Sequence, residues 1–254
     1  MMKASLVDFH CHLDLFPDPI AAIREADDSG IRTLTVTTTP KAWPRNQEMT
    51  QSSRFVRAAL GLHPELVAER AGEISLFDEY LPQARYVGEV GIDGGPRFYR
   101  SVELQKQIFA HILKSCALAG GRVLSVHSLR AVKIVLDLIE HALPEKPGQF
   151  VLHWFTGSKS EARRAADLGC FFSINLGMLA NEKGRELVAS LPLERVLTET
   201  DGPFTQISGR PARPADVAGT VAGIADLRRL SSQEICDVMR SNLKMLLSGL
   251  AEDE

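Results

Sequence analysis

The chain has 254 residues, of which 44% are hydrophobic and 24% are charged, and its formal net charge at pH 7 is −3. It is long enough to bury a substantial core, and its composition is that of an ordinary globular protein. The small negative charge argues against a protein that coats duplex DNA by bulk electrostatics, although a nucleic acid could still be gripped locally.

No run of about 18 apolar residues and no basic-then-apolar leader is present, so we expect no membrane span, no secretory signal and a cytoplasmic location. Four cysteines are scattered without a C-x-x-C spacing: Cys11, Cys116, Cys170 and Cys236. We interpret Cys116 and Cys170 as buried thiols of a reducing compartment.

Short β-branched or apolar runs alternate with amphipathic segments along the chain. Strands are predicted at 5–11, 33–38, 56–62, 85–91, 123–127, 149–154, 170–176 and 195–200. Helices are predicted at 19–29, 74–81, 101–119, 131–142, 158–168, 182–190, 214–227 and 231–249. The last helix opens with Ser231 and Glu234 at the spacing of a capping box.

This alternation predicts parallel strands joined by crossover helices. Eight such units in about 250 residues predict an α/β fold, a single (β/α)8 TIM barrel over residues 1–254. A doubly wound sheet is the alternative, and it is disfavoured because nothing resembles its G-x-G-x-x-G phosphate loop.

Histidines and acidic residues gather where the predicted strands end. His10 and His12 lie two apart, so on a strand both project to one face, although a surface histidine pair is the alternative for these two alone. The other strand ends carry His63, Glu89, Asp93, His127, His153, Glu199 and Asp201. Because barrel enzymes place their chemistry at the carboxyl ends of the strands, these side chains are candidates for one site.

Imidazole and carboxylate groups together suit Zn²⁺ or Mn²⁺, and oxygen-rich sites favour Mg²⁺. Four histidines and two acids exceed what one tetrahedral ion needs, so we predict two divalent ions sharing Glu89 as a bridge. His10, His12 and Asp201 would complete the first site, and His127 and His153 the second. Asp201 would also orient the hydrolytic water and accept its proton. Asp93 either braces a histidine or is a simple turn acid.

Six motifs occur together in this chain: HCH at 10–12, GLHP at 61–64, GEVGID at 88–93, VHS at 126–128, HWFTG at 153–157 and TDGP at 200–203. With NLKMLL at 242–247 they resemble the TatD family of metal-dependent nucleases, within the amidohydrolase-like superfamily. The resemblance implies a TIM-barrel phosphodiesterase that uses two divalent ions to remove nucleotides from DNA or RNA ends. It assigns ligand roles to the six predicted metal ligands. It also implies that His63 holds the scissile phosphate, a residue that would otherwise be equally a structural histidine.

Two loops depart from the family pattern. Residues 91–100 read GIDGGPRFYR, which could bring Arg97 or Arg100 to the substrate. Arg130 is displaced by one residue from the arginine that commonly follows the histidine of strand five. Further candidate substrate contacts are Arg210 and Arg213, after Asp201, and Trp154, which would either stack on a base or pack internally.

HWFTGS, SINLGM and TETDGPF resemble a divergent TatD-like branch of Qat anti-phage defence systems, which implies other Qat proteins as partners.

Three functions are therefore compared. The first is a two-metal nuclease acting on single-stranded DNA or RNA ends. The second is a hydrolase of another ester, an amide or aminoacyl-tRNA, and the third is a catalytically silent scaffold. Related barrels often bridge their metals with a modified lysine on strand four, where this chain has Glu89, and this favours the nuclease.

Overall fold

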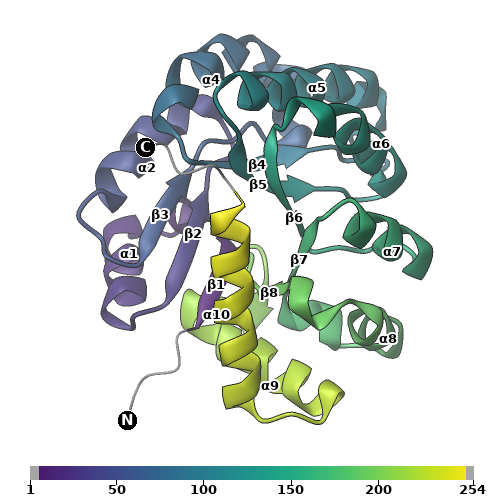
Figure 1. Ribbon diagram of the computed structural model, residues 1–254. Coiled ribbons are helices and arrows are strands. Elements are labelled where there is room, and N and C mark those ends of the chain that lie inside the picture. The colour runs from purple at the N-terminus through teal and green to yellow at the C-terminus, as the bar shows by residue number, and fades with distance from the viewer. Residues whose placement is uncertain (1–5, 250–254) are drawn as a thin grey trace.

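The computed structural model describes residues 6–249, so residues 1–5 and 250–254 of the predicted domain, and the first residue of the predicted strand 5–11, lie outside the described part. Eight parallel strands surround a common axis and helices cover their outer side (Figure 1). The strands are β1 Val7–Cys11, β2 Arg32–Val36, β3 Val56–Ala59, β4 Tyr86–Gly91, β5 Arg122–His127, β6 Gly148–His153, β7 Phe171–Ile174 and β8 Val196–Thr198. The predicted (β/α)8 barrel is confirmed.

Two sets of contacts close the ring between the sheets β1–β2–β3 and β4–β8. Between β3 and β4, the amide of Leu60 donates to Tyr86 O at 3.0 Å and that of Gly88 donates to Leu60 O at 2.9 Å. Between the ends of β8 and β1, Asp201 N donates to His10 O at 2.8 Å and His12 N donates to Gly202 O at 2.7 Å. Closure of the barrel therefore brings β1 and β8, the first and last strands whose ends carry predicted ligands, into direct contact.

Ten helices are found within residues 6–249: α1 Pro19–Asp28, α2 Trp43–Thr50, α3 Val67–Arg70, α4 Ile74–Tyr80, α5 Val102–Leu118, α6 Val132–Ala142, α7 Lys159–Asp167, α8 Glu182–Ser190, α9 Val217–Arg228 and α10 Ser232–Ser248. All eight predicted helices are present. Helices α2 and α3 were not predicted, and neither was the hairpin of β9 Gln206–Ile207 and β10 Arg210–Pro211. The inward face of α2 consists of Trp43, Asn46 and Thr50, so it lacks the apolar periodicity that marks the other helices.

Helix α10 packs at the amino-terminal ends of the strands. The side-chain amide of Asn242 donates to Leu193 O at 2.8 Å and to Val196 O, at the start of β8, at 2.7 Å. The predicted capping box is present, because Ser231 accepts from Glu234 N and the Glu234 carboxylate accepts from Ser231 N. In Figure 1 this helix lies in front of the barrel.

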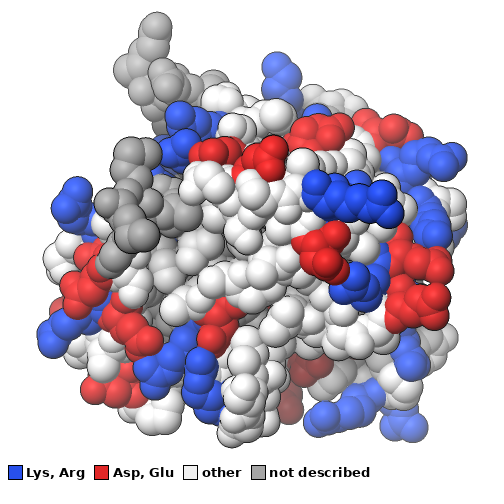
Figure 2. Space-filling model, turned by 90° about the horizontal axis from the view of Figure 1, so that it is seen from below, with Lys and Arg blue, Asp and Glu red and all other residues white. Residues whose placement is uncertain are grey.

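No helix within residues 6–249 combines the length and apolar character that a membrane span needs. Figure 2 shows one face of the molecule, on which basic and acidic side chains are interspersed. This mixture agrees with the small net charge and gives that face no broad basic surface.

Candidate metal centre

Four donor atoms converge where β1 meets the end of β8. His10 Nε2 and His12 Nε2 lie 3.3 Å apart, and each is 3.3 Å from Glu89 Oε2. Asp201 Oδ1 lies 3.7 Å from His10 Nε2 and 3.6 Å from His12 Nε2. All four side chains are buried. Two imidazole nitrogens and two carboxylate oxygens around one point form a donor set that suits Zn²⁺, Mn²⁺ or a related ion.

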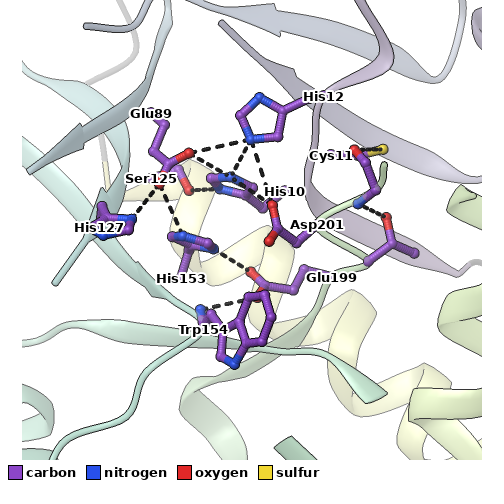
Figure 3. Close-up of polar contacts among 12 residues, drawn as sticks. His10, Cys11, His12, Glu89, Ser125, His127, His153, Trp154, Glu199 and Asp201 are labelled. Carbon is purple, nitrogen blue, oxygen red and sulfur yellow. Dashed lines mark hydrogen bonds and ion pairs between the residues drawn. The ribbon is translucent and has the colours of Figure 1, made fainter. Parts of the chain in front are cut away.

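The other oxygen of Glu89 faces a second group of donors. Glu89 Oε1 lies 2.6 Å from His127 Nδ1, 3.1 Å from His153 Nε2 and 3.1 Å from His63 Nε2. The carboxylate thus stands between the two groups, with one oxygen toward each (Figure 3). This arrangement fits the bridging position that the sequence predicts for Glu89.

Successive side chains of β1 point to opposite faces, which explains why its two histidines lie on the same side. His10 and His12 point to the barrel interior, whereas Cys11 between them points outward and packs near Leu13 and Phe16. The Cys11 thiol donates to Gly202 O at 3.4 Å.

Polar side chains behind the donors hold two of the rings through their outer nitrogens, and a carboxylate lies near the outer nitrogen of a third. His10 Nδ1 is 2.8 Å from Ser125 Oγ, and His127 Nε2 is 2.9 Å from Asp93 Oδ2. His153 Nδ1 lies 3.5 Å from Glu199 Oε2. Such partners fix ring orientation and leave the inner nitrogen available to a metal. The contact with His127 favours a bracing role for Asp93 over that of a simple turn acid, and its other oxygen accepts from Gly95 N at 2.6 Å.

Sequence reasoning missed Ser125 and left Glu199 without a role. Ser125 lies two residues before His127 on β5, and this period-2 spacing was the available signal. Glu199 is fully buried and accepts from Trp154 N and from the Asn175 side chain at 3.0 Å each, and from the Ser173 hydroxyl.

His63 differs from the other histidines in its hydrogen bonding. Its Nδ1 accepts from Glu65 N at 3.2 Å, so the proton of the neutral ring resides on Nε2, the atom that faces Glu89. A protonated Nε2 donates a hydrogen bond and does not ligate a metal. The geometry thus gives His63 the character of a donor to an anionic oxygen.

Burial and neighbouring charged groups shift the pKa values of the two acids in opposite directions. Burial raises the pKa of Glu89, but His63, His153 and His10 outweigh it and hold this pKa well below its usual range. Burial raises the pKa of Asp201 well above its usual range. Burial lowers the pKa of His127, yet hydrogen bonds to Asp93 and Glu89 raise it to about 9. A bound cation would favour the deprotonated form of each ligand. It would therefore oppose the raised pKa values of Asp201 and His127.

A pocket of about 440 Å³ opens onto the donors. It is lined by His63, Glu65, Glu89, His127, Ser128, Leu129, His153, Trp154, Thr156, Asp201 and Phe204. Two lining residues, Trp154 at φ +39° and Asp201 at φ +55°, adopt the left-handed conformation that non-glycine residues rarely occupy. Such backbone conformations gather at functional sites, where the surrounding structure holds them.

Of the predicted substrate contacts, His63 and Trp154 line this pocket. The guanidinium of Arg210 pairs with Asp216 at 2.7 and 2.8 Å, and that of Arg213 pairs with Glu25. The guanidinium of Arg97 lies 5.3 Å from the centre of the Phe98 ring. Arg130 lines a neighbouring hollow that shares Thr156 with the pocket. The structure therefore does not bring these four arginines into the pocket lining, and their contact with substrate stays a prediction.

The chain was compared with known families, proteins and structures. Residues 7–248 match the family model described as TatD related DNase. The uncharacterized metal-dependent hydrolase YjjV of Escherichia coli K12 is 31% identical over 270 residues, covering 97% of this chain and 99% of the relative. Human deoxyribonuclease TATDN3 is 28% identical over 268 residues, covering 96% and 95%.

The 3′-5′ ssDNA/RNA exonuclease TatD of Klebsiella pneumoniae is 32% identical over 175 residues, which cover 65% of each chain. The crystal structure of E. coli YjjV superposes with a TM-score of 0.86 at 26% identity, covering 96% of this chain and 98% of that one. The family match spans all the strands that carry the donors, and the structural match shares their barrel. The chain therefore belongs to the TatD family of metal-dependent hydrolases.

Proposed function

We propose that this protein is a two-metal phosphodiesterase that removes nucleotides from the ends of single-stranded DNA or RNA. The observation that carries the proposal is the position of Glu89, whose two oxygens face two separate groups of donors. His10, His12 and Asp201 would hold one ion with Glu89, and His127 and His153 the other. When bound, such a pair of ions supplies an activated water and stabilises the leaving oxygen of a phosphoester.

The side chains of this chain then have distinct tasks. Asp201 accepts the proton of the attacking water, because its carboxylate belongs to the donor group and lines the pocket. His63 donates from Nε2 to a phosphate oxygen, since its Nδ1 is occupied by Glu65 N. Ser125, Asp93 and Glu199 orient the rings that hold the metals.

The names of two relatives support nucleic acid as the substrate, since one is called a deoxyribonuclease and the other an ssDNA/RNA exonuclease. A catalytically silent scaffold is disfavoured, because all six predicted ligands are present and converge. On motif resemblance alone, we extend the proposal to a role in cytoplasmic anti-phage defence beside other Qat proteins. Co-purification with those proteins would test that extension.

The first test compares the wild-type protein with an Asp201→Asn variant on 5′-labelled single-stranded DNA and RNA, with Mg²⁺, with Mn²⁺ and with chelator. The wild type should shorten the substrate only with metal. Asp201→Asn should be at least about 100-fold slower, because a positioned general base contributes that much or more. Asp237→Asn, which alters an exposed acid on α10, is the matched control and should keep wild-type activity.

Intact substrate in every lane, from wild-type protein shown by elemental analysis to contain metal, would refute the nuclease proposal. Shortening that survives in Asp201→Asn would instead remove this residue from its proposed task.

A further inference from the structure

The pocket above the metal donors has mainly apolar walls. Leu129 and Phe204 line it with 41% and 61% of their surface exposed, and Trp154 adds a half-buried indole. None of the described residues that line it is lysine or arginine, and Glu65 adds a further carboxylate at its edge. A substrate in this pocket therefore meets apolar side chains beside the metal donors, and few fixed positive charges.

Phe204 is held close to those donors. Its backbone amide donates to Asp201 O at 3.0 Å, so the ring belongs to the tight turn that carries Asp201 itself. The ring meets His12 in an edge-to-face arrangement, with centroids 4.9 Å apart and planes at 83°. The side chain thus contacts a donor histidine on one side, while more than half of its surface stays accessible.

Single exposed apolar residues are common on proteins and need no explanation. The case of Phe204 is different, because Leu129 and Trp154 line the same pocket and the donors form part of its wall. The pocket volume of about 440 Å³ falls within the range of small-molecule sites, which is roughly 300–1,000 Å³. Apolar walls beside a centre that cleaves phosphoesters suit a flat ring with apolar faces, carried by the sugar next to the scissile phosphate.

We propose that Phe204 is a specificity-determining residue on which the nucleobase next to the scissile phosphate stacks, with Leu129 and Trp154 completing the apolar walls. This inference rests on the proposed function, and the group that it recognises is an unpaired terminal nucleobase. A paired base cannot offer its face to Phe204 without leaving its neighbours in the duplex. Binding energy then comes from stacking more than from contacts between phosphates and basic side chains.

Equilibrium binding tests the proposal without turnover. Single-stranded DNA oligonucleotides with a natural terminal base, or with an abasic analogue at the 3′ end or at the 5′ end, are titrated onto the Asp201→Asn protein with Mn²⁺. Loss of the base at the recognised end should weaken binding about 5- to 150-fold, the range expected for one stacked base. Adding Phe204→Ala should weaken binding of the natural oligonucleotide by a similar factor and leave binding of the abasic one unchanged. Phe204→Trp should restore the discrimination.

Two further measurements separate stacking from a general loss of structure. Leu118→Ala removes a side chain that is 82% exposed on α5 and serves as the control, with no expected effect on either oligonucleotide. The salt dependence of binding should correspond to about one or two released counterions, since the slope follows the number of basic contacts to phosphate. A slope that corresponds to five or more such contacts would overturn the proposal.

The outcomes distinguish this inference from the proposed function. Equal binding of natural and abasic ends, or equal losses for both in Phe204→Ala, overturns the stacking role even if the wild type shortens DNA. Discrimination that depends on Phe204, in a wild-type protein that leaves nucleic acids intact, upholds the stacking site and refutes the nuclease. In the active protein, Phe204→Ala should raise KM more than it lowers kcat.

Discussion

Two histidines of the centre are hydrogen-bonded through the nitrogen that faces away from it, and a third has a carboxylate near that nitrogen. Ser125 contacts His10, Asp93 contacts His127, and Glu199 lies behind His153. Each contact leaves the inner nitrogen directed at Glu89 or at the other donors. These positions are therefore set by side chains that do not line the pocket.

Asp93→Ala tests this dependence. Without its partner, the His127 ring loses a fixed orientation, so we expect the metal affinity of the site proposed at His127 and His153 to fall by about 10- to 100-fold. Metal titration followed by elemental analysis should show one ion retained and one lost at limiting Mn²⁺.

Asp78→Ala provides the matched control for that variant. Asp78 pairs with the exposed His111 at 2.8 Å, so the change breaks another Asp–His contact outside the centre. Equal metal content in the two variants would show that Asp93 does not position His127 for metal binding.

Helix α10 shows how one element supports a site on the far side of the barrel. Asn242 bonds two carbonyl oxygens around the start of β8, and the end of β8 leads into Asp201. At that end, Asp8 of β1 accepts from Thr200 N at 2.8 Å and from the Thr200 hydroxyl at 2.6 Å. The short strand β8 is thus held at both ends.

Asn242→Ala would leave those two carbonyl groups without their partner. Each unsatisfied buried group costs about 1–3 kcal/mol, so we expect the free energy of unfolding to fall by about 2–6 kcal/mol. The shift of the urea midpoint, followed by circular dichroism, measures this change.

Gln233→Ala removes an exposed amide from the same helix, where it contacts Asp237 at 3.2 Å, and should change the stability by less than about 0.5 kcal/mol. An unchanged midpoint in Asn242→Ala would mean that the two carbonyl groups do not depend on this side chain.

Across the whole molecule, the closed barrel and its helices bury all four cysteines, which come from β1, α5, the residue before β7, and α10. Burial raises the pKa of Cys116 and of Cys170 to about 12, so almost none of either thiol ionises at pH 8. Burial also raises the pKa of Cys11 and of Cys236. The thiolate is the reactive form, and here it is both scarce and inaccessible.

We therefore expect a thiol reagent such as dithionitrobenzoate to modify less than one cysteine per native chain at pH 8. All four should react in guanidinium chloride, because unfolding exposes them and returns each pKa to its ordinary value. Rapid reaction of the native protein with two or more equivalents would show that the barrel opens locally.

The sequence by itself determined the barrel and singled out the six histidines and acids that converge at one end of it. Both follow from periodicities that operate over a few residues: alternation within each strand, and the repeat of strand and helix. Histidines at strand ends must then meet at one end of a closed barrel, as His10, His127 and His153 do. The roles of the ligands and of His63 in metal binding and catalysis stay predictions.

The tertiary structure alone decided which groups surround that centre. His10 meets Ser125 across 115 residues, and no local pattern encodes that contact. The position of the Arg213 guanidinium is also set by long-range pairing, since it reaches Glu25 on α1. Phe204 lies against His12 because the ends of β8 and β1 are hydrogen-bonded together. Such contacts depend on how distant elements pack. The position of a residue along its own strand tells which face its side chain occupies, as for Ser125, but not which distant partner it meets.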